Sequence, residues 1–178
     1  PGTPVVYWKE KEGVDRVIEE KAKSLSCPCI SVSKELVDLH FFGDKRIDFS
    51  YNTRYYGYVR FSVSTKAVYQ TENAALAIAA AEQVLGKDML QPIQKGIAAM
   101  HWAGRMEEVL PKVFFDGAHN EDGIDAFLAS VKCDACKGKR SLLFSVVQGR
   151  QYEKMAGMIL DSNLFDRIYT APIQSARS

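Results

Sequence analysis

An aspartate and a histidine stand close together in the sequence DGAHN, directly after a short apolar run. That run, Val113–Phe115, contains no polar residue and predicts a strand that is buried on both faces. Asp116 and His119 then follow the carboxyl end of the strand, where open α/β sheets place their ligands. Asp116 either binds a ligand or bonds to its own turn, and His119 is either functional or a capped surface histidine. The residues alone favour neither interpretation.

The residues after this pair predict the start of a helix. Asn120 can cap the helix, and Glu121 and Asp122 suit the positive end of its dipole. Two carboxylates would not be expected at a helix N-terminus that binds phosphate, because they would repel the negatively charged phosphate. We therefore do not interpret DGAHN as a phosphate loop, and Asp116 is better suited to a sugar or a polar group near it. Four apolar residues mark one face of the helix: Ile124, Phe127, Leu128 and Val131.

Two further places carry side chains suited to a nucleotide. The guanidinium of Arg105 can bind phosphate as a planar fork, and the alternative is a surface pair with Glu107 or Glu108. Gln70 and Asn73 lie three residues apart at the start of an alanine-rich helix, so both project from the same end. An asparagine amide offers a donor and an acceptor together, which fits the edge of an adenine. Helix capping and hydrogen bonding within the first turn are the alternative, and the residues alone favour it.

The elements that must position these side chains alternate between strands and helices. The sequence predicts strands at residues 5–8, 29–32, 113–115, 141–147 and 167–171, and helices at 11–25, 70–85, 89–100, 152–160 and after 120. The first strand, helix and strand predict a parallel crossover unit. Residues 48–51 and 58–63 alternate between apolar and polar side chains, which predicts a hairpin with one wet face. From residue 113 onward, the alternating order predicts a Rossmann-like half-fold.

The composition narrows the classes of partner. The 178 residues are 47% hydrophobic, and 23 Lys and Arg residues balance 22 Asp and Glu residues. No basic stripe predicts nucleic-acid binding, and neither a bilayer-length apolar run nor a signal-peptide pattern occurs. We therefore expect no nucleic-acid partner and no membrane.

Four cysteines offer a further hypothesis, a zinc or redox protein. They form the pairs Cys27 with Cys29 and Cys133 with Cys136. The second pair ends a helix, whereas a thioredoxin-type pair opens one. We favour free thiols in a reducing cytoplasm, and metal analysis of the purified chain would decide between the two.

The motifs HWAGR and DGAHN, at their spacing, resemble the domain junction and the first strand and loop of the C-terminal domain of folylpolyglutamate synthase/dihydrofolate synthase, a branch of the Mur ligase superfamily. The family pattern is W-P-G-R, about a dozen residues, and then D-G-A-H-N. Residues 67–73 resemble the family's G-x-x-Q-x-x-N. The chain departs from the family at Ala103, where Pro is usual, and at Ala67, where Gly makes a left-handed turn. The resemblance covers the whole chain but only the later part of a family member.

The resemblance implies an α/β fold: the tail of a Mur-type central ATPase domain followed by a Rossmann-like C-terminal domain, both incomplete. Residues 1–100 would be the C-terminal part of the ATP-binding domain, and residues 101–178 a truncated glutamate-binding domain. The resemblance assigns ATP binding to Asn73, Arg105 and Asp116. It assigns a catalytic role to His119, which would orient the incoming amino acid or touch the transferred phosphate. Residues 148–151 lack the charged pair that family members often carry there, so we expect no ligand contact at that point.

The reaction that the resemblance implies joins L-glutamate to a folate or dihydropteroate carboxylate through an acyl phosphate made with ATP. Such a ligase needs magnesium and a P-loop that ends in Gly-Lys-Ser/Thr. The dipeptides Gly86-Lys87 and Gly138-Lys139 are each followed by the wrong residue. We therefore expect the P-loop and the magnesium ligands upstream of Pro1, and a fragment that is inactive alone. The alternative is a non-enzymatic module that binds a nucleotide or a partner. The coding DNA upstream of Pro1 would discriminate between them.

Overall fold

The structure, a computed structural model, describes residues 2–43, 45–147 and 151–173. The chain forms two compact units. The first contains residues 1–65 and 69–101, and the second contains residues 66–68 and 102–178. Residues 148–150, where we expected no ligand contact, lie outside the described residues.

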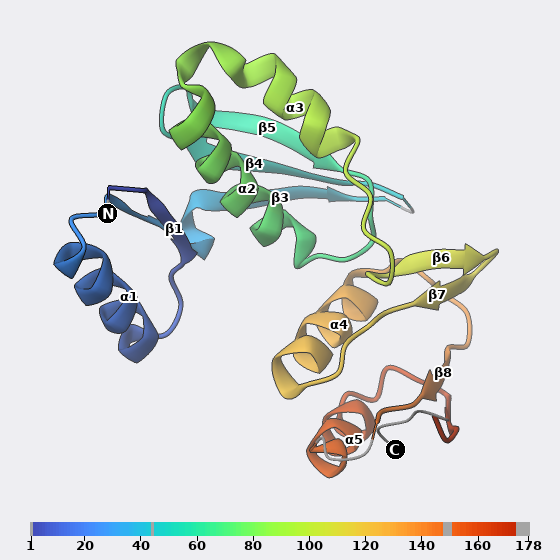
Figure 1. The fold of residues 1–178 in the computed structure, drawn as a ribbon. Coiled ribbons are helices and arrows are strands. Elements are labelled where there is room, and N and C mark those ends of the chain that lie inside the picture. The colour runs from blue at the N-terminus through green and yellow to red at the C-terminus, as the bar shows by residue number, and fades with distance from the viewer. Residues whose placement is uncertain (1, 44, 148–150, 174–178) are drawn as a thin grey trace. The chain divides into compact units, whose positions relative to one another are not determined.

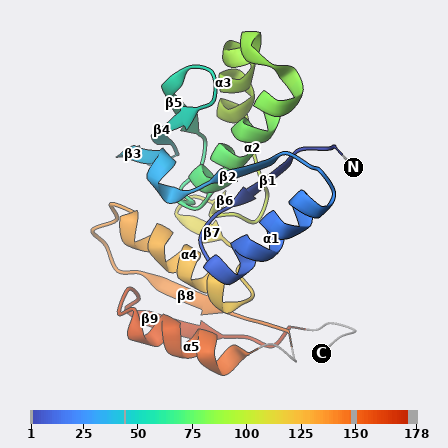
Figure 2. The ribbon, with the colours of Figure 1, turned by 90° about the vertical axis from the view of Figure 1, so that its left-hand side faces the viewer.

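The first unit begins with the predicted crossover. Strand β1 (Val5–Trp8) and strand β2 (Cys29–Val32) pair in parallel, and helix α1 (Glu12–Ser24) connects them. Figure 2 shows α1 running along one side of the two strands. The sequence predicts one apolar face for this helix, with Val14, Val17 and Ala22 on it, and this is only partly correct, because Val14 and Val17 are exposed whereas Ala22 is buried. A sheet of two four-residue strands is too narrow to cover the whole stripe of a 13-residue helix.

A three-stranded antiparallel sheet forms the other half of the first unit. It contains β3 (Val37–Phe42), β4 (Ile47–Thr53) and β5 (Gly57–Val63), in that order. The predicted hairpin of β4 and β5 is confirmed, with a shorter turn than expected. Strand β3 was not predicted, although Val37–Phe41 alternates between apolar and polar side chains. It pairs with β4 through a register that is irregular at its centre.

Helix α2 (Gln70–Leu85) lies in the centre of the first unit and contacts both sheets. Its bounds match the prediction, and it ends at Gly86, which has a φ of 76°. Its buried alanines are small, so the strands approach its backbone closely. Helix α3 (Leu90–Ala98) follows a short 3-10 turn, Lys87–Met89, and covers β5 (Figure 1). A second short 3-10 turn, Lys34–Leu36, precedes β3.

The second unit contains a hairpin, two helices and a parallel strand pair. In order, these are β6 (Glu107–Leu110), β7 (Val113–Phe115), α4 (Glu121–Cys133), β8 (Ser141–Phe144), α5 (Tyr152–Asp161) and β9 (Arg167–Thr170). Strands β6 and β7 pair antiparallel, and β8 and β9 pair in parallel. The predicted alternation of strands and helices is confirmed, although β8 is shorter than expected.

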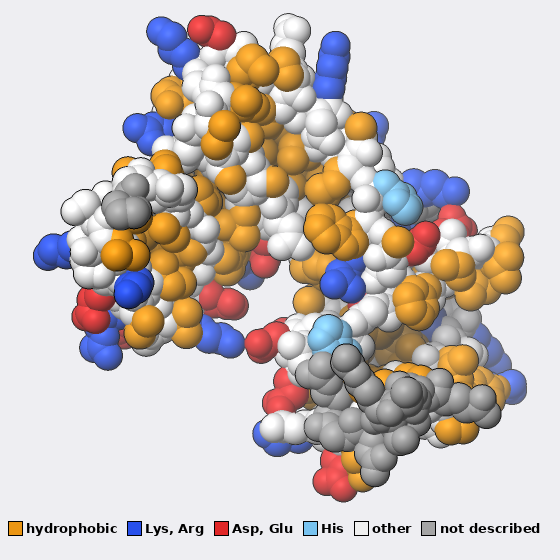
Figure 3. Space-filling model, viewed as in Figure 1, with side chains coloured by type: hydrophobic (Ala, Val, Ile, Leu, Met, Phe, Trp, Pro, Cys, Tyr) orange, Lys and Arg blue, Asp and Glu red, His pale blue; other side chains and the backbone are white. Residues whose placement is uncertain are grey.

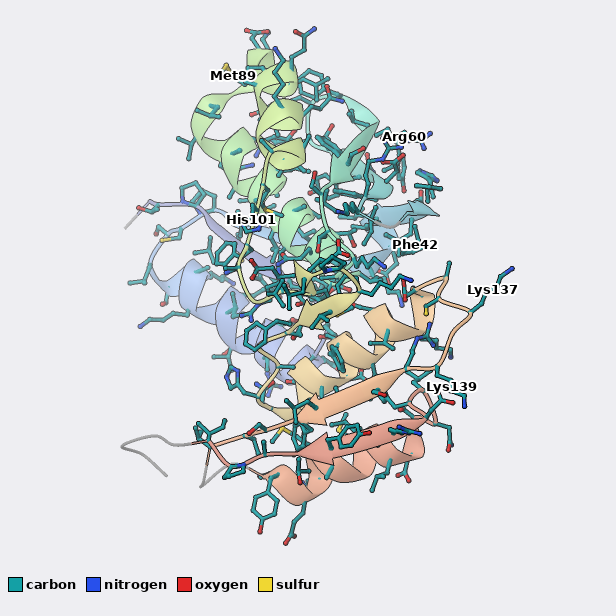
Figure 4. The ribbon with its side chains drawn as sticks, turned by 90° about the vertical axis from the view of Figure 1, so that its right-hand side faces the viewer. Phe42, Arg60, Met89, His101, Lys137 and Lys139 are labelled. Atoms are coloured by element: carbon teal, nitrogen blue, oxygen red, sulfur yellow. The ribbon has the colours of Figure 1, made fainter. Side chains whose placement is uncertain are left out.

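The core of the second unit lies on one side of β8 and β9. Ile124 of α4 packs with Met155 and Ile159 of α5, and half-buried residues of both strands surround them. Figures 2 and 4 show both helices on the same face of these strands. The apolar stripe predicted for α4 is therefore confirmed.

The strand predicted to be buried on both faces is not. Val113 is 49% exposed and Phe115 is 57% exposed, because no described element covers that face of β7. Apolar side chains gather over the β6–β7 hairpin (Figure 3), where Val109 and Leu110 are also exposed. No helix in the described part of the chain is long and apolar enough to span a membrane.

Candidate functional site

Two loops of the second unit meet beside the β6–β7 hairpin. The hairpin register aligns Glu107 with Phe115, so the turn before β6 lies against the loop after β7. The N–H of Gly117 donates to the carbonyl of Gly104 at 2.8 Å and joins the two loops. Gly104 has a φ of 70°, a conformation that glycine adopts without strain. The hairpin thereby brings together Arg105 from one loop with Asp116 and His119 from the other.

Asp116 braces this pair of loops. Its Oδ2 accepts the N–H of Met106 at 3.0 Å, and its Oδ1 accepts the N–H of Ala118 at 2.9 Å. Met106 has a φ of 47°, so the aspartate stabilises a backbone conformation that residues other than glycine rarely adopt. The bond to Ala118 is the local turn that the sequence offered as the alternative for this residue. A carboxylate oxygen has two lone pairs, so these bonds do not preclude a ligand contact.

Arg105 lies half-buried over Gly117. Its Nη1 donates to the carbonyl of Gly104 at 3.2 Å. A Cβ atom on Gly117 would come within 2.8 Å of the same nitrogen, so a larger residue at this position would require the guanidinium to move. Glu107 and Glu108 accept backbone N–H groups instead, and no carboxylate in the described part of the chain forms an ion pair with Arg105. The alternative, a surface pair with Glu107 or Glu108, is therefore not observed among the described residues.

His119 is exposed, and its tautomer follows from the hydrogen bond that its ring makes. Nδ1 lies 2.9 Å from the carbonyl oxygen of Gly117. A carbonyl oxygen only accepts, so Nδ1 carries the hydrogen. In the neutral ring, Nε2 is then an acceptor on the side away from the backbone. The histidine is thus anchored by one nitrogen and presents the other.

The helix after this loop is capped as predicted. The side chain of Asn120 accepts the N–H of Gly123 at 2.8 Å. Glu121 and Asp122 lie in the first turn, and Glu121 faces Lys154 of α5 at 3.4 Å. The two carboxylates occupy the position where a phosphate would otherwise be favoured, in agreement with our interpretation of the loop.

Gln70 and Asn73 belong to the first unit, at the start of α2. The Nδ2 of Asn73 donates to the Oε1 of the buried Gln70 at 2.9 Å. This bond is the first-turn hydrogen bond that the sequence offered as the alternative, whereas the N-cap residue of α2 makes no side-chain capping bond. The Gln70 side chain orients the exposed amide of Asn73, which retains its oxygen and one hydrogen for a partner.

Residue 67, where the family's glycine makes a left-handed turn, is not among the described residues with positive φ. The loop before α2 therefore forms with alanine at this position. Neither Gly117 beneath Arg105 nor the bracing by Asp116 followed from the sequence. Both depend on hairpin register, which single-sequence patterns do not specify.

The cysteines offer no metal centre within the described residues. All four are free thiols. The described ranges contain no group of three or more His, Cys, Asp or Glu side chains that could hold a metal ion.

The chain is similar to known proteins over nearly all of its length, although no family model matches it. It is 27% identical over 164 residues to the dihydrofolate synthase/folylpolyglutamate synthase of Bacillus subtilis, a match that covers 86% of this chain and 37% of the relative. The folylpolyglutamate synthase of Mycobacterium tuberculosis in complex with ADP superposes with a TM-score of 0.85 at 18% identity, covering 99% of this chain and 40% of that one. An FPGS–AMPPCP–folate complex gives 0.82 at 24% identity, with 97% and 43% covered.

These comparisons confirm the resemblance and the α/β fold predicted from the two motifs. The chain is similar to a C-terminal portion of folylpolyglutamate synthases and spans less than half of their length.

Proposed function

We propose that this chain is part of an ATP-dependent ligase that joins L-glutamate to a folate or pteroate carboxylate through an acyl phosphate. In this proposal, residues 1–100 belong to the central ATP-binding domain and residues 101–178 to the glutamate-binding domain. The observation that carries it is the clustered pair of loops in the second unit, in a fold shared with an FPGS–AMPPCP–folate complex. A planar cation, a carboxylate and a histidine with a free nitrogen lie on these loops.

Each residue has a proposed role that follows from its contacts. Asn73, held by Gln70, binds the adenine edge with its remaining donor and acceptor. Arg105 binds a phosphate of ATP, because its guanidinium retains N–H groups beyond its single backbone bond. Asp116 accepts a hydrogen bond from the nucleotide sugar or a group near it while it braces the loops. His119 is the proposed catalytic residue.

In the proposed reaction, a carboxylate oxygen takes the terminal phosphoryl group of ATP and ADP leaves. The amino group of glutamate then attacks the acyl carbon, and phosphate leaves as the amide forms. The Nε2 of His119 accepts a hydrogen bond from the incoming amine, which positions it for attack. The charge of Arg105 stabilises negative charge on the phosphate groups.

Magnesium is implied by such a reaction, but the described residues do not fit a magnesium site. No step is therefore assigned to a metal in this chain. The 178 residues also contain no P-loop. We propose that they do not form the amide bond by themselves. Phosphate release from ATP that requires both folate and glutamate, catalysed by the purified chain, would contradict this.

The role of Arg105 is tested by titrating the chain with ATP and following backbone amide resonances. We expect shifts at Asn73, Arg105 and residues 116–119, and an affinity loss of about tenfold in Arg105→Ala, the loss of a charged hydrogen bond. Lys139→Ala is the matched control, because it removes an exposed cation from the same unit. Equal affinities of Arg105→Ala and the control would overturn the assignment.

The competing proposal is a non-enzymatic module that binds a nucleotide or a partner. Both proposals allow ATP binding, so the titration does not separate them. Their difference lies in the acyl acceptor: only the ligase proposal requires that folate and glutamate perturb residues 116–119 in the presence of ATP. The free thiols support a reducing cytoplasm as the compartment in either case.

A further inference from the structure

Two glycines lie at the centre of the loops that carry Arg105 and Asp116. The N–H of Gly117 donates to the carbonyl of Gly104 at 2.8 Å, and we call these two residues the glycine pair. A Cβ atom on Gly104 would meet only the ring of Phe115 within 4 Å, among the described residues that are not its chain neighbours. A Cβ atom on Gly117 would meet only the guanidinium of Arg105 and the carbonyl of Gly104. The glycine pair therefore leaves room for a ring and a cation.

The ring of Phe115 lies against Gly104 but is not enclosed. Its Cε1 and Cδ1 atoms would be 3.3 and 3.6 Å from the Cβ atom of a larger residue at position 104. Both atoms belong to one edge of the ring, and the residue is 57% exposed. Much of the ring surface is therefore uncovered, directly before Asp116 in the sequence.

The guanidinium of Arg105 adjoins the same glycine pair. Its Nη1 donates to the carbonyl of Gly104 at 3.2 Å and lies over the α-carbon of Gly117. A guanidinium has five N–H donors, and this bond uses one of them. The aromatic ring thus contacts Gly104 at its α-carbon, and the cation contacts it at its carbonyl oxygen.

An exposed aromatic ring beside a guanidinium suits a ligand that joins a planar ring to an anion. Aromatic side chains hold nucleobases by stacking, whatever groups the edge of the base carries. A guanidinium binds phosphate as a planar fork. A nucleotide contains both groups, separated only by its sugar. A pteroate also joins planar rings to an anion, so the experiment must separate these two ligands.

We propose that Phe115 is a binding residue for ATP, on whose ring the adenine base stacks while Arg105 holds the phosphate groups. The inference rests on the proposed function, because that function supplies ATP as the ligand of Arg105. It adds an apolar residue to a site that was assembled from polar side chains. It also gives the glycine pair a role, because a side chain at either position would displace the ring or the guanidinium.

The stacking role is tested by calorimetric titration of the purified chain with ATP and with inorganic triphosphate. We expect Phe115→Leu to weaken ATP binding about tenfold and to leave triphosphate binding unchanged, because triphosphate has no base to stack. Phe115→Tyr should bind both ligands as the wild type does. Arg105→Ala should weaken both. An unchanged triphosphate affinity also shows that the loops of the Phe115→Leu variant are intact.

Val113→Ala is the matched control. Val113 belongs to the same strand and is 49% exposed, so its substitution removes apolar surface from the hairpin without removing a ring. We expect no change in either affinity. Equal losses of ATP affinity in Val113→Ala and Phe115→Leu, or unchanged ATP affinity in Phe115→Leu, would overturn the proposal.

Proton resonances of the bound adenine give a readout that a merely structural role of Phe115 would not change. A stacked aromatic ring should shift them upfield in the wild type and in Phe115→Tyr, but not in Phe115→Leu. If the wild-type chain binds neither ATP nor triphosphate, the proposed function fails, and the stacking role fails with it. If it binds both with equal affinity, the phosphate role of Arg105 stands and stacking is wrong. Pteroate binding that depends on Phe115, with ATP binding that does not, would overturn the assignment to adenine.

Discussion

Helices cover one face of the sheet β3–β4–β5 in the first unit and one face of the strand pair β8–β9 in the second. The opposite, outer faces of the two sheets carry different side chains. In β4, Phe49 is buried in the core, whereas the outward-facing Asp48 binds polar side chains. In β8, Phe144 packs toward the helices, and the outward-facing Leu143 is 65% exposed. Tyr169, which pairs with Leu143, is also exposed. The outer face of β4 is therefore polar and hydrogen-bonded, whereas β8 and β9 expose the apolar Leu143 and the aromatic Tyr169 on theirs.

The difference shows what a strand pattern specifies. In β4, polar and apolar residues alternate, so the sequence alone indicates which side chains face the core. In β8 and β7, nearly every residue is apolar, so the sequence indicates a strand but not which face is covered. The prediction of two-sided burial failed at β7 for this reason.

The largest effect is expected from Phe49→Ala in the first sheet. Phe49 is fully buried and stacks on Phe61, its register partner, with ring centroids 5.7 Å apart. Loss of the ring should lower the free energy of unfolding of the first unit by about 3–5 kcal/mol, from lost burial and the cavity left behind. Urea unfolding followed by hydrogen exchange of each unit measures this. Phe49→Leu should cost less than half as much, and equal losses would show that the site collapses around alanine.

The second unit should respond to Met155→Ala. Met155 is fully buried between Ile124 and the strands β8 and β9. We expect a loss of about 2–4 kcal/mol, smaller than at Phe49, because the surrounding core has fewer fully buried side chains to lose contact with. Met155→Leu is the volume-conserving control. A larger loss at Met155 than at Phe49 would reverse the comparison between the two cores.

Much of the fold followed from local patterns. The bounds of α2 follow from its run of alanines and its terminal Gly86, and the α4 cap from Asn120, because these signals act within one or two turns of chain. Strand β3 did not, since its pairing with β4 depends on tertiary register. The burial of α1 was only partly predicted, because it depends on how wide a sheet the helix meets.

The candidate site shows the same limit. Asp116 and His119 were selected by residue type and position after a strand. The hydrogen bond of Asp116 with Met106 was not, because it joins residues across a hairpin. The contact of Phe115 with Gly104 gave no sequence signal either, since it depends on the register of the same hairpin.

The polar face of the first sheet should respond to pH through Asp48. A hydrogen bond from Ser62, followed by those from the guanidinium groups of Arg60 and Arg46, lowers the pKa of Asp48 against the effect of burial. The folded state therefore binds this proton less readily than the unfolded state. The resulting stabilisation is complete at neutral pH and declines as the pH falls below about 4.

Asp48→Asn should accordingly lower the free energy of unfolding by about 1–3 kcal/mol at pH 7, because it removes charged hydrogen bonds, and by less at pH 3. Urea midpoints of wild type and variant at both pH values measure the difference. Asp38→Asn, at an exposed position of β3, is the control and should show little change at either pH. A pH-independent loss at Asp48 would mean that the amide disturbs packing rather than charge.

The smallest change in the free energy of unfolding is expected on the exposed outer face of β8. Leu143→Ser changes an exposed side chain that packs against no helix, so the free energy of unfolding should change by less than about 0.5 kcal/mol. Leu142→Ser, one residue earlier, introduces a hydroxyl on the face that packs on Ile124 and Met155 and should cost at least about 2 kcal/mol. The two substitutions share chemistry, strand and register and differ only in face. Equal losses at Leu142 and Leu143 would mean that the outer face of β8 is also covered in solution. The proposed contrast between the outer faces of β8 and β4 would then be wrong.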